Sequence, residues 1–105
     1  MQKLWQINGV KKQNNMRESE LQTKIKDKLT KSGWLVIKLE KTSWNGIPDL
    51  MCIRKGNVIF LEVKTESGII APLQQHRIKV LNEVGCFARV VRSVDDIEVF
   101  TYKNI

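Results

Sequence analysis

Residues 48–64 read PDLMCIRKGNVIFLEVK, in which two mostly apolar stretches flank a short polar turn. The stretches 48–54 and 58–64 have the length and apolar content of β-strands. Lys55-Gly56-Asn57 between them is a combination of residues that tight turns favour. The segment therefore predicts a β-hairpin, around which the rest of the chain is arranged.

The length of the turn decides which side chains share a face of this hairpin. If the loop is 55–56, Asp49 faces Glu62, and if the loop is 56–57, Asp49 faces Lys64. Because side chains alternate along a strand, Asp49, Glu62 and Lys64 lie on one face in both cases. A three-residue loop without a bulge would place Asp49 on the opposite face.

Hydrophobic periodicity predicts a helix before the hairpin. Three apolar residues recur at every fourth position and a glycine ends the pattern, so the helix is expected from Ser19 to Gly33. Its apolar residues are Leu21, Ile25 and Leu29. The next stretch, 34–40, is too short for a second helix and is predicted as a strand, and 41–46 is predicted as a loop.

After the hairpin, a loop over 65–70 leads to a helix that begins at Pro72 and ends at Gly85. A fourth strand, 86–91, and a short helix capped by Ser93 follow. The order αβββαβ plus a short helix predicts an α/β fold, with a small mixed sheet flanked by helices.

Length and composition restrict the class of protein. A chain of 105 residues suits one domain, and its two cysteines, far apart, exclude a disulfide scaffold and a cysteine-rich zinc site. The N-terminal residues lack a secretory signal and no apolar run could span a membrane, so an intracellular, cytoplasmic protein is expected.

The formal net charge is +7, and the first third of the chain carries most of it. Residues 1–33 contain eight Lys or Arg against three Asp or Glu, whereas residues 34–105 contain ten against eight. Such a basic segment is typical of a surface that binds a phosphate backbone, although a solvated helix face gives the same pattern.

Asp49, Glu62 and Lys64 are the candidates for chemistry, because charged side chains are costly in an apolar strand unless they pair or bind a metal. Two carboxylates on neighbouring strands form an oxygen-rich site of the kind that Mg²⁺ or Mn²⁺ prefers. A lysine beside them can orient a water molecule or stabilise charge on a phosphate. The pattern suits phosphodiester hydrolysis, and the alternative is an exposed cross-strand salt bridge.

The motifs 47–49 (IPD) and 62–64 (EVK) resemble the PD-(D/E)XK nuclease motif, and the αβββαβ order resembles the restriction-endonuclease-like core of that superfamily. The closer resemblance is to the VRR-NUC domain, the virus-type replication-repair nuclease. It is carried by 46–50, 62–64, 71–74 and the helix that ends at Gly85, and it spans about 18–95. We therefore predict one nuclease domain over 17–105, preceded by an N-terminal arm of unknown structure over 1–16.

The resemblance implies a role for each residue that matches the family's motifs. Asp49 and Glu62 would be metal ligands together with the main-chain carbonyl of Val63, and Lys64 would be the catalytic lysine. Glu20 would support the metal directly or through water, and Gln74 would lie near the active site. Glu20 could instead be a solvated partner of Lys24, and Gln74 an ordinary polar residue of a first helical turn.

The resemblance also implies an activity. It points to a Mg²⁺- or Mn²⁺-dependent DNA endonuclease that cuts branched or structured DNA, such as four-way junctions or flaps, as a homodimer, in the host cytoplasm if the protein is viral. The alternatives are a nuclease acting on RNA and a nuclease-like module that binds nucleic acid without cutting it.

Two residues of the loop before Asp49 have structural or functional interpretations. Trp44 could stack on an unpaired base or cover the core. Gly46 is expected to adopt a turn conformation that other residues avoid and so to direct Asp49 into the hairpin.

Overall fold

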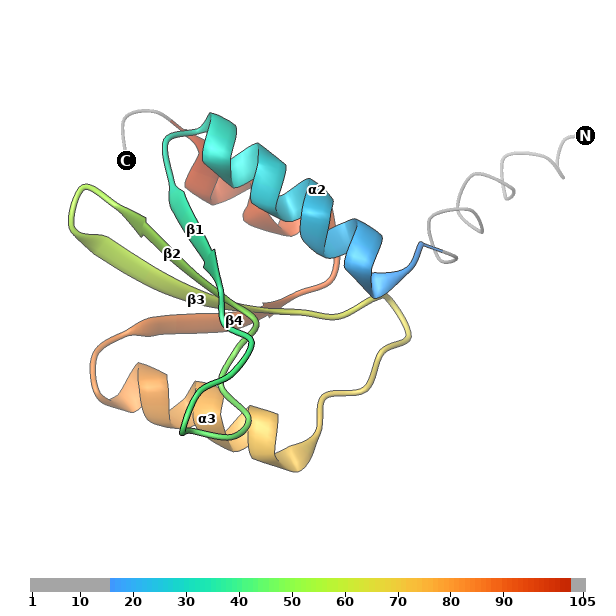
Figure 1. The fold of residues 1–105 in the computed structure, drawn as a ribbon, viewed down its shortest axis with the longest axis vertical. Coiled ribbons are helices and arrows are strands. Elements are labelled where there is room, and N and C mark those ends of the chain that lie inside the picture. Colours follow the sequence, from blue (N-terminus) through green and yellow to red (C-terminus); the bar gives the residue numbers. More distant parts are fainter. Residues whose placement is uncertain (1–15, 103–105) are drawn as a thin grey trace, which may run out of the picture.

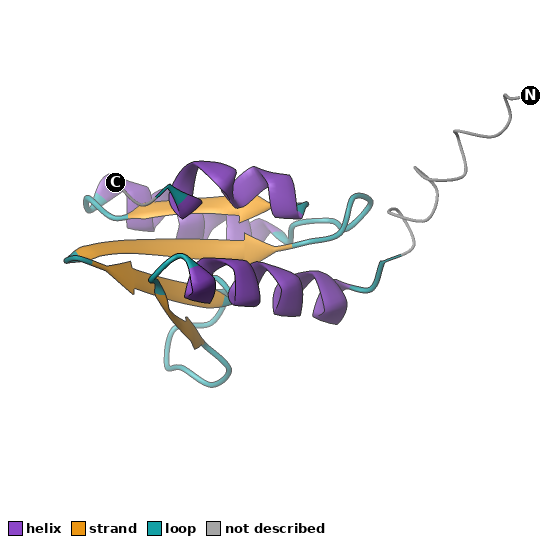
Figure 2. Cartoon of the chain, turned by 90° about the horizontal axis from the view of Figure 1, so that it is seen from above, coloured by secondary structure: helices purple, strands orange, loops and turns teal. Residues whose placement is uncertain are grey.

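Four strands form one mixed sheet in the computed structural model, which describes residues 16–102. The strands lie in chain order across the sheet: β1 (Leu35–Lys38), β2 (Leu50–Arg54), β3 (Asn57–Val63) and β4 (Phe87–Val91). The first three are antiparallel to their neighbours, whereas β3 and β4 are parallel. Figure 2 shows β3 and β4 running in the same direction with β2 opposed to them.

Helices cover both faces of the sheet (Figure 1). α2 (Glu18–Lys31) and the 3₁₀-helix η1 (Val94–Thr101) lie on one face, and α3 (Pro72–Glu83) lies on the other. The predicted α/β fold and element order are therefore confirmed, including the short helix after Ser93. The three apolar residues that predicted α2, namely Leu21, Ile25 and Leu29, are all buried in the core.

β1 is shorter at both ends than the predicted strand over 34–40, and at its start Trp34 is bonded to the last turn of α2. The main-chain N–H of Trp34 donates to the Leu29 carbonyl, and its indole Nε1–H donates to the Phe100 carbonyl at 2.7 Å. Trp34 therefore joins α2 to η1, and the strand begins one residue later.

The hairpin adopts the first of the two predicted registers. Lys55 and Gly56 form a two-residue loop and have φ values of 51° and 82°, as turns that match the twist of the strands require. Leu50 pairs with Leu61, so the position before Leu50 is opposite Glu62. Asp49 consequently lies beside Glu62 at the open end of the hairpin.

Alternation along β3 divides its side chains between the two faces. Leu61 and Val63 pack in the core with the buried residues of α2, while Phe60 packs with Leu81 of α3. Glu62 has the same parity as Phe60 and therefore points to the α3 face. A carboxylate is thus buried beside the apolar Phe60 and Val90, at the point where charged residues begin on this face.

The loop before Asp49 is attached to α3 by one glycine and one arginine. Gly46 has φ +85°, and a Cβ added there would lie 2.8 Å from Leu73 Cγ. Arg77 Nε–H donates to the Asn45 carbonyl at 2.6 Å, and its guanidinium lies 4.5 Å from the centre of the Trp44 ring. Trp44 packs against the core cluster on the α3 face, as a cover for the core would.

We predict that Gly46→Ala is more destabilising than Gly56→Ala. Both residues have positive φ, for which an alanine costs about 1–2 kcal/mol, but a Cβ at Gly56 meets nothing within 4 Å. The added contact with Leu73 should cost about 1–3 kcal/mol more. Urea unfolding of both variants measures the difference, and equal losses of stability would show that the loop does not depend on this close approach.

Candidate active site

Asp49 is held by two hydrogen bonds, one between its main chain and the residue after β1 and one between its side chain and β3. Its carbonyl accepts the Leu39 N–H at 2.8 Å, and its Oδ2 accepts the Val63 N–H at 2.9 Å. The carboxylate therefore takes the place of a main-chain acceptor where the β2–β3 ladder ends. This bond fixes the orientation of the half-buried Asp49 side chain beside β3.

Glu62 is the buried member of the site, with only 1% of the residue exposed. Its Oε2 accepts the Gln74 Nε2–H at 3.0 Å, while its buried Oε1 accepts no hydrogen bond from the residues described. Burial, together with the negative charge of Asp49, raises the pKa of Glu62 to about 8, and the positive charge of Lys64 opposes part of this shift. Without a cation, the site favours the protonated carboxyl.

Lys64 directly follows β3 and lies between two carboxylates. Its Nζ is 3.9 Å from Glu62 Oε2 and 4.0 Å from Glu18 Oε1, and its side chain is 17% exposed. Its main-chain N–H donates to the Val91 carbonyl, so the backbone at this position is held by β4. Figure 1 shows the segment after β3 passing close to the first turn of α2, which carries Glu18.

Gln74 reaches the site from the first turn of α3, where its two ends bind different partners. Its Oε1 accepts the Ala71 N–H at 2.9 Å, which helps to cap the helix, and its Nε2 donates to Glu62. The adjacent Gln75 instead donates to the Ile70 carbonyl at the surface. Gln74 thus connects the start of α3 to the buried carboxylate.

The structure does not bring Glu20 to this group. Its Oε1 accepts the Arg17 N–H at 3.0 Å and caps the N-terminus of α2, with 54% of its side chain exposed. Glu18, which sequence reasoning missed, reaches Lys64 instead. The signal was the helical period, because Glu18 precedes Leu21 by three and Ile25 by seven residues and so lies on the same side of the helix as these buried residues.

The site combines few metal-binding side chains. In residues 16–102, no three His, Cys, Asp or Glu side chains form a cluster that could hold an ion by themselves. The oxygen donors that converge are the carboxylates of Asp49 and Glu62, and the Val63 N–H of β3 holds the first of them. The described helices also include none with the length and hydrophobicity of a membrane span.

Comparison with known proteins identifies the family. A family model of the VRR-NUC domain matches residues 2–95, so the match begins before the motifs that carry the resemblance and includes residues outside the described part. No curated protein matches the chain.

Solved structures agree with the family match. One described as a VRR_NUC domain is 30% identical to this chain, covers 81% of it and 97% of its own length, and has a TM-score of 0.71. A second, described as a VRR_NUC domain protein, has a TM-score of 0.62 over 78% of this chain and 82% of its own, and at 22% identity it supports the fold alone. The chain belongs to the VRR-NUC domain family, which implies a nuclease role and nucleic acid as its partner.

Proposed function

We propose that this protein is a Mg²⁺- or Mn²⁺-dependent endonuclease that hydrolyses phosphodiester bonds in branched or otherwise structured DNA. The observation that carries the proposal is the convergence of Asp49, Glu62 and Lys64 at the open end of the hairpin. A solvated salt bridge does not explain it, since Glu62 is buried and one of its oxygens accepts no hydrogen bond from the described residues.

The residues present fit a divalent cation. Magnesium and manganese prefer oxygen donors, and a buried carboxylate without a donor for one oxygen is stabilised by a cation. Asp49 and Glu62 would hold it, with the Val63 carbonyl, because the N–H and C=O of a strand residue point to the same side and this N–H faces Asp49. Such a cation polarises a phosphate oxygen and lowers the pKa of bound water.

The other residues then have distinct tasks. The Lys64 ammonium, held between Glu62 and Glu18, would orient the attacking water or stabilise charge that develops on the phosphate. Gln74 would keep the Glu62 carboxylate in one orientation through its hydrogen bond. We assign the role of the helical acid to Glu18 in place of Glu20, because Glu18 contacts Lys64.

The basic residues of the first third of the chain would bind the DNA backbone. α2 starts at the site with Glu18 and carries lysines on the faces that do not pack on the sheet. Phosphate contacts of this kind make affinity fall steeply with added salt. The helical residues with positive side chains are Lys24, Lys26, Lys28 and Lys31.

We also propose that the protein acts as a homodimer, which would place two sites on a symmetric four-way junction. A domain of this size has a small surface for DNA, which a second copy would enlarge. Exposed apolar side chains available for such a contact include Leu35, Phe87, Val99 and Tyr102.

The proposed activity predicts metal-dependent cleavage that Asp49→Ala abolishes. Even the loss of a residue that only orients a metal ligand lowers activity about 10- to 100-fold, so the loss of a ligand should lower it at least about 100-fold. Labelled linear, flap and four-way-junction DNA and the corresponding RNA would be incubated with Mg²⁺, Mn²⁺ or EDTA, with Asp95→Ala as an exposed-acid control.

Each outcome of this assay has one meaning. Cleavage that persists in Asp49→Ala indicates a contaminating nuclease. Binding to branched DNA without cleavage under any condition contradicts the proposal and favours a non-cleaving module, whereas a preference for RNA corrects the substrate.

Glu18→Ala is predicted to lower the cleavage rate, whereas Glu20→Ala is predicted to lower the stability. Loss of Glu18 frees Lys64 and should lower the cleavage rate by about tenfold or more with little change in stability. Loss of Glu20 removes a helix cap and should lower the free energy of unfolding by about 1 kcal/mol. Single-turnover kinetics measures the cleavage rates and urea unfolding measures the stabilities. A larger loss of cleavage in Glu20→Ala than in Glu18→Ala would assign the role of the helical acid to Glu20.

Glu62→Gln is predicted to stabilise the protein in EDTA above pH 8. The folded-state pKa of about 8 exceeds the ordinary value, so unfolding releases a proton between about pH 4.5 and 8 and the free energy of unfolding falls as pH rises through this window. Glu62→Gln has no carboxyl to titrate, so its free energy of unfolding should not show this fall, which amounts to up to about 5 kcal/mol in the wild type.

Urea unfolding from pH 4 to 9 tests this prediction, with the exposed Glu98→Gln as control, which should follow the wild type. Added Mg²⁺ should stabilise the wild type and not Glu62→Gln. If Glu62→Gln is less stable than the wild type at pH 9 in EDTA, the buried Glu62 carboxylate does not destabilise the folded protein.

A further inference from the structure

The segment that follows Lys64 folds back on it as a tight turn. The Gly68 N–H donates to the Thr65 carbonyl at 3.0 Å and closes the turn. A Cβ added at Gly68 would lie 3.4 Å from both Cβ and Cδ of Lys64, so the turn packs against the aliphatic stem of that lysine. The turn 65–68 therefore packs along one side of the Lys64 side chain.

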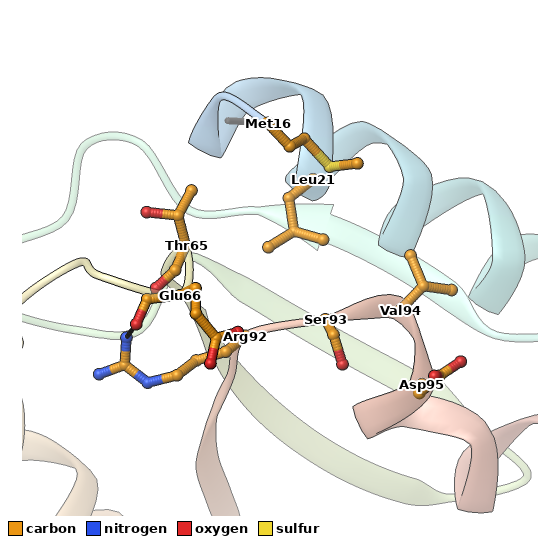
Figure 3. Close-up of a pocket in the computed structure, with 8 residues that line it drawn as sticks. All are labelled: Met16, Leu21, Thr65, Glu66, Arg92, Ser93, Val94 and Asp95. Atoms are coloured by element: carbon orange, nitrogen blue, oxygen red, sulfur yellow. Dashed lines mark hydrogen bonds between the residues drawn. The ribbon is translucent and has the colours of Figure 1, made fainter. Parts of the chain in front are cut away.

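Arg92 follows β4, and its guanidinium holds this turn by donating hydrogen bonds to main-chain carbonyls of the turn. Its Nη1 donates to the Thr65 carbonyl at 2.7 Å, to the Gly68 carbonyl at 2.8 Å and, more weakly, to the Glu66 carbonyl at 3.3 Å. Figure 3 shows the Arg92 side chain reaching beneath Thr65 and Glu66, at the border of a pocket between α2 and the start of η1. The guanidinium thus gathers the carbonyl groups of both ends of the turn.

The main chain of Arg92 is fixed by a hydrogen bond to η1. Its main-chain N–H donates to Asp96 Oδ2 at 2.7 Å, in the first turn of η1. The residue before it, Val91, pairs with Val63 in the sheet and accepts the Lys64 N–H. Arg92 and Lys64 therefore leave neighbouring parallel strands at the same level, with the turn between them.

We infer that Arg92 is a positioning residue for Lys64, which keeps the ammonium between Glu62 and Glu18 by clamping the turn 65–68. The inference rests on the proposed role of Lys64 in cleavage. A lysine at the end of a strand has a long flexible side chain, and a charge-assisted clamp on the adjoining turn restricts both its backbone and its stem. All three bonds come from the one nitrogen Nη1, so lysine at position 92 would keep the charge and the donors, but its side chain is one bond shorter and would reach the turn less well.

The test compares Arg92→Gln, Arg92→Lys and Arg89→Gln in single-turnover cleavage and DNA binding. Arg89 is an exposed residue of β4 whose guanidinium lies over the Phe87 ring, so its variant removes the same charge without touching the turn. Arg92→Gln is expected to lower the cleavage rate about 10- to 100-fold with DNA affinity changed less than twofold relative to Arg89→Gln. Arg92→Lys should recover only part of the loss.

A double-mutant cycle separates positioning from general stability. If Arg92 acts through Lys64, adding Arg92→Gln to Lys64→Ala should have no further effect on the cleavage rate. An equal loss in both backgrounds, or a wild-type rate in Arg92→Gln, would overturn the inference. Thermal unfolding verifies that each variant is folded, and Arg92→Lys provides the comparison if the glutamine variant does not fold.

NMR of the lysine side chains gives a readout that needs no activity. The Lys64 Cε–Hε signal, assigned by its loss in Lys64→Arg, should move toward those of exposed lysines in Arg92→Gln and stay in place in Arg89→Gln. If the wild type cleaves nothing but this shift occurs, the positioning stands and the proposed function fails. If cleavage occurs and neither the rate nor the signal responds to Arg92, the function stands and the inference fails.

Discussion

The burial of one carboxylate, Glu62, in the middle layer of the molecule governs the arrangement of everything around it. The α3 face of β3 is apolar up to this residue, so the charge needs partners that water cannot supply. Gln74 supplies a hydrogen bond and Lys64 a positive charge. Asp49 adds a second negative charge, which raises the pKa of Glu62 and makes the ionised pair unfavourable without further positive charge.

α3 links the parts of the site that come from distant segments. It provides Gln74 directly, and through Leu73 and Arg77 it holds the loop that leads into Asp49. The contacts of Gly46 and of Gln74 lie within one turn of the same helix. α3 therefore contacts both the loop before Asp49 and the carboxylate of Glu62.

Much of the fold could be predicted because its signals are local. The apolar repeat of α2 predicts a helix, and the turn residues between β2 and β3 predict a hairpin. The register stayed open between two loops because glycine and asparagine both tolerate positive φ, and the structure places Lys55 there instead of Asn57. The family resemblance points to Glu20 as the helical acid, whereas in the structure Glu20 caps α2 and Glu18 contacts Lys64.

Contacts with main-chain carbonyls cannot be predicted from a sequence pattern, because every residue has a carbonyl. The turn held by Arg92 is therefore invisible in the pattern of side chains.

The strand order has a consequence for how this fold can grow. The acids and the lysine belong to the two inner strands or to the residues that adjoin them, while β1 and β4 are the outer ones. In the described part of the chain each outer strand has one sheet neighbour, so its other side is where added secondary structure or another polypeptide could attach. Extensions at either margin would leave the distances among Asp49, Glu62 and Lys64 unchanged, which allows the same small core to be built into larger assemblies.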